Sequence, residues 1–187
     1  AEMRDRTGMF GGSPAQIAAN YRAGIQRIPR AFQTLQVPII AAVNGAAAGL
    51  GMVQALMCDM RFCADTAKFT VAFSKRGLIG EYGISWVLPR LVGQATALDL
   101  MMSSRIVMAQ EALEIGMVNR VVPADQLMKV VLEYASDLAM NVSPSSMAVM
   151  KRQVYSDYGK DVATASKDAL VLMQKSFTRS DFKEGVQ

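Results

Sequence analysis

An uncharged stretch limits how this chain can fold. Residues 31–58 contain no Asp, Glu, Lys or Arg, and the stretch is long enough to cross a bilayer as one helix. It is interrupted by a proline, by several glycines and glutamines, and by Asn44-Gly45 in its middle, which is a turn signal. A buried strand over 38–43, packed on both faces, then a turn and a buried helix over 46–57 fit this pattern better than a membrane span.

Strand and helix patterns alternate along the rest of the chain. Extended segments are predicted over 60–63, 68–71 and 118–122. Helices are predicted from Ser13-Pro14, over 83–88 with an end at Pro89, over 95–102, over 110–115 with Gly116 as the cap, over 124–141, from Ser143-Pro144 and over 161–177. This alternation indicates an α/β fold with a helix-rich C-terminal third. A length of 187 residues is typical of one domain.

The composition excludes several kinds of chemistry. The chain contains no histidine, which excludes Ser-His-Asp and Cys-His catalysis and any His-ligated metal site within it. The net charge of +4 comes from 20 basic and 16 acidic residues. This mild excess is compatible with a polyanion such as nucleic acid, and equally with a small anionic ligand.

The two cysteines point to a reducing compartment. Cys58 and Cys63 form neither a zinc pattern nor a disulfide framework, so buried free thiols and a cytoplasmic location are expected. The first residues, AEMRDR, are charged rather than apolar and are not typical of a signal peptide.

A glycine-rich segment is the first candidate binding site. Gly45 to Gly51 follows the predicted strand and opens the predicted helix, which is the usual setting for binding an anion on main-chain amides. The spacing matches neither a phosphate-binding loop with its Lys-Ser/Thr nor the dinucleotide fingerprint. Close helix–strand packing explains the same small residues equally well.

Glu81 is the candidate acid or base. It lies in GLIGEYGISW (residues 77–86), an apolar, glycine-rich segment that enters a helix. A carboxylate in apolar surroundings has a raised pKa and can exchange protons near neutral pH. The alternative is an acid near a helix N-terminus that interacts favourably with the helix dipole.

Several ordered motifs carry a family resemblance. They are VPIIAAVNGAAAGLG (37–51), CDMR (58–61), AKF (67–69), LPRLVG (88–93), AQEALEIGMVN (109–119), VVP (121–123), Ser143-Pro144 and Lys151. Over about residues 35–152 the chain resembles the enoyl-CoA hydratase/isomerase (crotonase) family.

The resemblance implies a fold and a ligand. The fold is the ClpP/crotonase-like α/β fold of stacked ββα units, with a core over 1–120 and a helical region over 121–187 that forms trimers or dimers of trimers. The ligand is an acyl-CoA thioester, with no cofactor beyond that coenzyme A, no metal, no nucleic acid and no membrane. Two main-chain amides would form an oxyanion hole for an enolate, and the second amide falls on Leu50, between Gly49 and Gly51.

The chain departs from the family pattern in three ways. Family members have several strands and an Ala-Gly-x-Asp-Leu-type segment before the point where this chain begins, so we expect a fragment without the first amide and with an open sheet edge. The two glutamates of hydratases fall on Val53 and Phe73, which cannot exchange protons. Glu81 falls where double-bond isomerases of the family carry an Asp or Glu.

These departures favour a double-bond isomerase with Glu81 as its single acid and base. Ala46, Val53, Phe73, Trp86 and Lys151 are the expected substrate-binding positions, and Lys151 could meet the phosphates of coenzyme A or simply be solvated on a helix face. A 2-enoyl-CoA hydratase of fatty-acid β-oxidation is the first alternative. A non-catalytic protein that binds acyl-CoA or RNA is the second.

Overall fold

The computed structural model describes residues 27–186 together with residues 13, 15, 16, 18 and 19. The helix predicted from Ser13-Pro14 lies largely outside the described residues. Within them, the Gln16 N–H donates to Ser13 Oγ at 3.3 Å, and the first complete helix is α2 (Arg27–Thr34).

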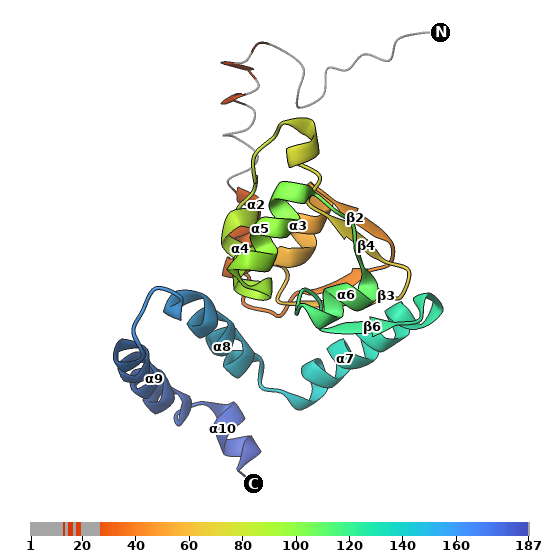
Figure 1. Ribbon diagram of the computed structural model, residues 1–187. Helices are drawn as coiled ribbons and strands as arrows, with labels where there is room; N and C mark the ends of the chain where they lie inside the picture. Colours follow the sequence, from red (N-terminus) through yellow and green to blue (C-terminus); the bar gives the residue numbers. More distant parts are fainter. Residues whose placement is uncertain (1–12, 14, 17, 20–26, 187) are drawn as a thin grey trace.

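Six short strands form two sheets (Figure 1). The first sheet has the order β1-β3-β6 and is parallel, with β1 (Ile40–Val43), β3 (Met60–Ala64) and β6 (Arg120–Val122). The second has the order β2-β4-β5, with β2 (Ala46–Ala48), β4 (Lys68–Thr70) and β5 (Val107–Met108). Strands β2 and β4 are parallel, whereas β4 and β5 are antiparallel.

The chain winds through these sheets in repeated ββα units. The first unit is β1, β2 and α3 (Leu50–Met57); the second is β3, β4, the short turn η1 (Ser74–Arg76), α4 (Ile84–Val92) and α5 (Gln94–Ser103). The first strands of the two units pair with each other, as do the second strands. This arrangement confirms the predicted α/β fold of stacked ββα units.

The prediction of one helix over 46–57 is wrong at its start. Ala46–Ala48 is the strand β2, and the helix begins only at Leu50. The main chain of Ala46–Ala48 pairs with Lys68–Thr70, so a partner far along the sequence overrides the helical preference of three alanines. Gly49, with φ 51° and ψ −120°, separates the strand from the helix.

The prediction that a helix ends at Pro89 is also wrong, because α4 continues to Val92. Proline lacks the N–H that would bond one turn back. Beside it, Arg90 Nη1 donates to the carbonyl oxygen of Trp86 at 2.7 Å, which supplies a further donor in this turn. The helix ends instead at Gly93, whose φ is 78°.

The predicted cap at Gly116 is confirmed. Gly116 has φ 76° and follows α6 (Ala109–Glu114). Its N–H donates to Leu113 O at 3.1 Å, and the Met117 N–H donates to Ala112 O at 2.8 Å. These two bonds are those of a Schellman motif, which satisfies the last helical carbonyls.

Helices dominate the C-terminal third, as predicted. The elements are η2 (Ala124–Gln126), α7 (Leu127–Asn141), α8 (Pro144–Asp157), α9 (Val162–Ser176) and α10 (Ser180–Gly185). The strand expected over 118–122 is shorter, and α10 was not predicted. Helix α7 contacts β1 and β3, whereas α8 to α10 form a group at one side of the core (Figure 1).

The core has two parts. The larger packs α3, α4 and α5 against the second sheet, and the smaller packs Phe62 and Ala64 of β3 against α7. The prediction that the first strand is buried on both faces is wrong, since all four β1 residues are half-buried. Among the described strands, β1 pairs only with β3. None of the described helices is long and apolar enough to cross a membrane.

Candidate active site

The N-terminus of α3 presents unpaired main-chain donors. The Gly49 N–H donates to Thr70 O at 3.0 Å, and the first helical bond runs from the Val53 N–H to Gly49 O at 3.0 Å. The N–H groups of Leu50, Gly51 and Met52 therefore have no acceptor within the helix. Because the helix dipole places partial positive charge at the same end, these donors can stabilise an oxyanion.

Gly49 sets the direction of these donors. Its φ of 51° is a conformation that L residues rarely adopt. A Cβ built on Gly49 would lie 3.7 Å from Phe73 Cε1 and 3.8 Å from Val71 O. The Phe73 ring therefore lies against the glycine that precedes the Leu50 amide.

The two positions where the family's hydratases carry glutamates are apolar and buried. Val53 is 1% exposed and Phe73 is 7% exposed. Both belong to one core cluster that also contains Tyr82. The structure therefore brings Gly49, Leu50, Val53 and Phe73 together, and neither of the two side chains offers a group that could activate water.

Glu81 lies in a tightly constrained loop before α4. On one side is Gly80, where a Cβ would come within 2.6 Å of Met101 Cε. On the other is Tyr82, which is 9% exposed and has φ 55°, an unusual conformation for a residue with a side chain. The buried Tyr82 side chain anchors this loop in the cluster that holds Val53 and Phe73.

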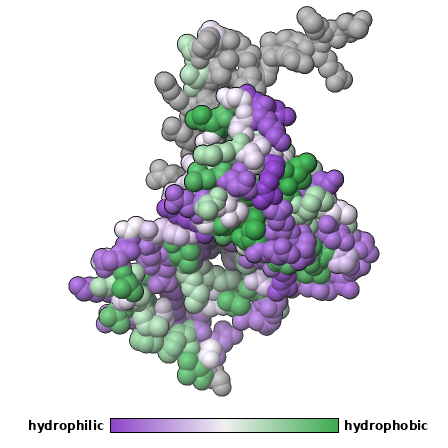
Figure 2. Space-filling model, in the orientation of Figure 1, coloured by the Kyte–Doolittle hydropathy of each residue, from purple (hydrophilic) through white to green (hydrophobic). Residues whose placement is uncertain are grey.

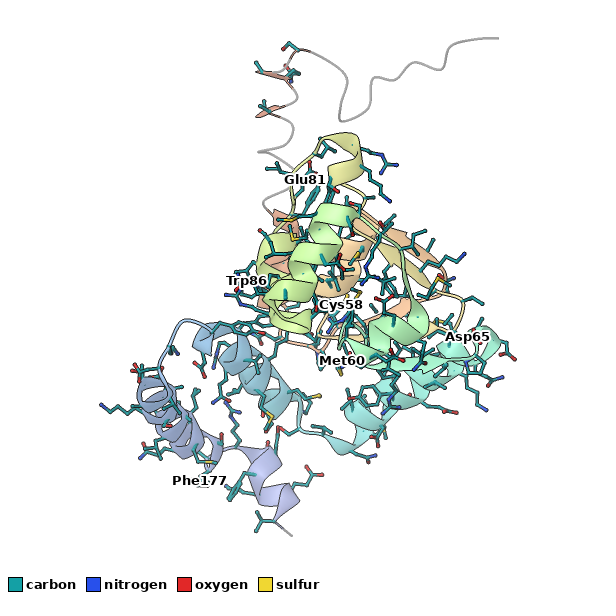
Figure 3. The ribbon with its side chains drawn as sticks, in the orientation of Figure 1. Cys58, Met60, Asp65, Glu81, Trp86 and Phe177 are labelled. Carbon is teal, nitrogen blue, oxygen red and sulfur yellow. The ribbon has the colours of Figure 1, made fainter. Side chains whose placement is uncertain are left out.

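The Glu81 carboxylate is available. Its side chain is half-buried, and among the described residues no hydrogen bond or ion pair engages it. Its main-chain oxygen accepts from the Ile84 N–H at 3.0 Å, which fixes the backbone at the start of α4. Figure 3 shows Glu81 close to η1, away from Trp86 and Cys58.

The remaining predicted positions lie elsewhere. Ala46 is exposed in β2, opposite Lys68. Trp86 lies on α4, where its ring packs edge-on against the ring of Tyr158, with 5.2 Å between the ring centres. Lys151 Nζ forms an ion pair with Asp59 Oδ2 at 2.7 Å, and its side chain is only 7% exposed. Lys151 thus has an internal partner, and its predicted contact with substrate phosphates stays a prediction.

Asp59 is the centre of a network that sequence patterns did not predict. Oδ2 accepts from the Ile39 N–H at 2.8 Å and from Lys151, and Oδ1 accepts from the Tyr155 hydroxyl at 3.1 Å. Burial and the neighbouring carboxylate raise the pKa of Tyr155, so it stays a hydrogen-bond donor. One sequence feature could have indicated this network: Asp59 is the first charged residue after the uncharged stretch of residues 31–58.

The cysteines are free and buried, as predicted. Burial raises the pKa of Cys58, and it raises the pKa of Cys63 to about 11. Thiols in this state are poor nucleophiles. Within the described part of the chain, no three acidic or sulfur side chains are grouped so as to hold a metal ion.

The stacked ββα units have main-chain donors at one helix N-terminus and, in the next unit, the Glu81 carboxylate, which no described residue engages. Together these features define a protein of the crotonase-like class. Comparison with known families gives the same result. The family model for enoyl-CoA hydratase/isomerase matches residues 4–187. The chain belongs to this family, which confirms the resemblance.

Individual relatives carry both activities in their names. The 1,2-epoxyphenylacetyl-CoA isomerase of Escherichia coli is 34% identical over 162 residues, covering 84% of this chain and 60% of that protein. A probable enoyl-CoA hydratase of Mycobacterium leprae is 34% identical over 165 residues, which cover 86% of this chain and 55% of that protein. The crystal structure of an enoyl-CoA hydratase from Bacillus anthracis superposes with a TM-score of 0.89 at 29% identity. The match covers 95% of this chain and 68% of that chain.

The chain spans about half the length of the curated relatives that it matches, 54% and 55% of two of them. The activity, substrates and partners of the whole protein are therefore proposals.

Proposed function

We propose that this protein moves a double bond within an acyl-CoA thioester, with Glu81 as the single acid and base. The observation that carries the proposal is the Glu81 carboxylate, which has no partner among the described residues and is held by a loop whose Tyr82 packs in the cluster with Val53 and Phe73. In the described part of the chain, Glu81 supplies a carboxylate in this loop, and Val53 and Phe73 are apolar at both hydratase positions.

The proposed reaction starts from a 3-enoyl-CoA. The Glu81 carboxylate removes a proton from C2. The electrons of the C2–H bond form a C1–C2 double bond, and those of the carbonyl bond move onto the thioester oxygen, so the C3–C4 double bond becomes part of a dienolate. The Leu50 N–H donates a hydrogen bond to that oxygen and stabilises the dienolate. Protonated Glu81 then returns the proton to C4, which leaves a 2-enoyl-CoA and the original carboxylate. One acid is sufficient, because the same proton leaves and returns.

A homotrimer, or a dimer of trimers, is the proposed assembly. Helices α8, α9 and α10 contain no buried residue. Their large exposed apolar residues include Val154, Val162, Leu170, Val171, Met173 and Phe182. Figure 2 shows green, apolar residues on this group of helices. Surface of this kind is typical of a subunit interface.

Hydration of a 2-enoyl-CoA is the second candidate, favoured by the hydratase names of many relatives. In that reaction Glu81 alone would activate water. It predicts a 3-hydroxyacyl-CoA product, which is heavier than its substrate by one water.

The deciding experiment gives the full chain a 2-enoyl-CoA and a 3-enoyl-CoA in separate incubations, with the products separated by retention time and mass. Conversion of the 3-enoyl to the 2-enoyl thioester at constant mass supports isomerisation. A gain of one water on the 2-enoyl substrate supports the hydratase instead. No reaction with either substrate contradicts both and favours a binding protein; binding that falls steeply with salt would then indicate RNA.

A further inference from the structure

A cleft lies on the opposite side of the core from Glu81 (Figure 3). Its volume is about 370 Å³, within the range of small-molecule sites. It is formed by the end of α3, the start of β3 and the facing sides of α4, α7 and α8. Figure 3 shows Cys58, Met60 and Trp86 on the side of the core that faces α8, and Figure 2 shows the surface hollowed there. Leu50 and Glu81 do not line it.

The walls of this cleft are aromatic and aliphatic. The rings of Trp86 and Tyr158 pack edge-on with their centres 5.2 Å apart, and the ring centres of Tyr155 and Tyr158 are 6.4 Å apart. Tyr134 and Leu138 of α7 line the facing wall. Side chains of this kind bind the apolar body of a small ligand.

The charged groups of the cleft are unbalanced. It is lined by one acid, Asp59, and by three bases, Arg61, Arg90 and Lys151. Asp59 is already neutralised by Lys151 at 2.7 Å. Neither arginine has a carboxylate within salt-bridge distance among the described residues. Two positive charges at an apolar cleft therefore lack a counter-ion within that part of the chain.

Arg61 is the more informative of the two. It is only 5% exposed. Its Nε donates to Met117 O at 2.8 Å, and its Nη1 donates to Leu56 O at 3.3 Å and Cys58 O at 2.6 Å. The two Nη1 bonds cap the C-terminus of α3, and the Nε bond reaches the loop after α6, but all three acceptors are neutral carbonyls.

The third nitrogen of Arg61 is unused. Nη2 has no acceptor among the described residues, and it is not among their fully enclosed, unpaired atoms. It therefore keeps access to solvent, and the cleft that Arg61 lines is the route to it. A guanidinium that is only 5% exposed and is bonded to neutral carbonyls alone would be stabilised by an anion that accepts from its remaining N–H pair.

Arg90 places the second positive charge over the aromatic wall. Its guanidinium lies 4.3 Å from the centre of the Trp86 ring and 5.2 Å from that of Tyr158. We propose that this cleft binds a small carboxylic acid with an apolar body, whose carboxylate accepts from Arg61 Nη2 while its body packs between Trp86 and the α7 wall.

The single tryptophan of the chain, Trp86, provides the readout. Sodium octanoate and its neutral analogue octanamide are titrated into the full-chain protein while the tryptophan fluorescence is recorded. We expect a saturable change with octanoate and at least tenfold weaker binding of octanamide, because only the carboxylate forms a charge-assisted bond.

Four variants test whether octanoate binds in this cleft through Arg61. Arg61→Met should weaken octanoate binding at least tenfold, and Leu138→Phe, which fills the cleft without touching the α3 cap, should do the same. Lys129→Met removes one positive charge from the exposed face of α7 and should bind octanoate like the wild type. Glu81→Gln should also bind normally, so failure of the isomerase proposal leaves this test intact.

Three outcomes would overturn the proposal. They are equal affinity for octanoate and octanamide, binding that Leu138→Phe leaves unchanged, and no fluorescence response to octanoate at any concentration tested. A Trp86 signal that instead changes with protein concentration alone would show that a second copy of the chain covers the cleft, and would equally contradict a ligand site.

Discussion

At Gly49 the main chain needs a conformation that only glycine adopts easily, whereas at Gly51 it does not. Gly49 has φ 51°, and Gly51 lies in the first turn of α3 with no atom within 4 Å of an added Cβ. Gly49→Ala should lower the free energy of unfolding by about 1–3 kcal/mol and reduce turnover by moving the Leu50 N–H. Gly51→Ala should be neutral or stabilising by about 0.5–1 kcal/mol.

Chemical denaturation and kinetics of the two variants provide the check. If Gly49→Ala matches Gly51→Ala in both stability and turnover, the strained glycine does not position the oxyanion donor.

Lys151 could stabilise the fold through Asp59 or bind the substrate phosphates, and replacing it distinguishes these two roles. Its ammonium is enclosed with Asp59, at 7% and 16% side-chain exposure. Lys151→Met would leave Asp59 with a buried, unpaired charge, so we expect a loss of about 3–5 kcal/mol of stability. Lys160→Met is the matched control, because Lys160 pairs with Asp157 and Asp168 at the surface, and its effect should be far smaller.

The two roles of Lys151 give opposite results in denaturant titrations. Unchanged stability together with a raised KM for the CoA substrate would show that Lys151 meets the phosphates instead.

At the scale of elements, the sequence predicted correctly those helix ends that depend only on neighbouring residues. The cap at Gly116 and the helix start at Ser143-Pro144 follow from residues within one turn, and both are present, with Ser143 Oγ accepting from the Ser146 N–H at 3.1 Å. Ala46–Ala48 was misassigned because its strand depends on pairing with Lys68–Thr70. Distant partners of this kind leave no local signal.

The contact between α8 and α10 contains a titratable link. Asp181 Oδ2 accepts from Ser143 Oγ at 2.5 Å and from Ser145 Oγ at 2.6 Å. These bonds lower the pKa of Asp181 from 3.8 to about 2. A lowered folded-state pKa stabilises the fold above the ordinary value, and this stabilisation is lost as the pH falls through about 2.

Asp181→Asn should therefore be less stable than the wild type at pH 5. The difference between their melting temperatures should shrink below pH 3.8 and vanish near pH 2. A difference that stays constant from pH 5 to pH 2 would show that the carboxylate charge does not hold α10 in place.

At the scale of the molecule, the C-terminal helices leave apolar side chains uncovered. Leu170 is 66% exposed on α9. If this face forms the proposed subunit interface, Leu170→Glu should shift the full chain from trimer towards monomer in sedimentation velocity. Lys175→Glu places an acid on the other side of α9, five residues from Leu170, and should shift it less. A wild-type chain that sediments as a monomer at every concentration would contradict the assembly.

Ordered motifs spread over the chain were sufficient to predict the family and the ββα architecture. The candidate site was only partly predictable. Gly49, Leu50, Val53 and Phe73 meet at one helix end because α3 and the residue before η1 pack in one core, whereas Trp86 and Lys151 line the cleft beside α8. Motif position alone does not tell which side of a helix a residue faces.

The most direct test of the central claim is the rate at which Glu81→Gln converts a 3-enoyl-CoA to the 2-enoyl-CoA. The amide keeps the size of the side chain but cannot accept and return the proton, so turnover should fall by roughly 100-fold or more. Glu133→Gln, an exposed acid on α7, is the matched control and should keep wild-type turnover. If Glu81→Gln isomerises the substrate as fast as the wild type, Glu81 is not the proton carrier and the proposed mechanism is wrong.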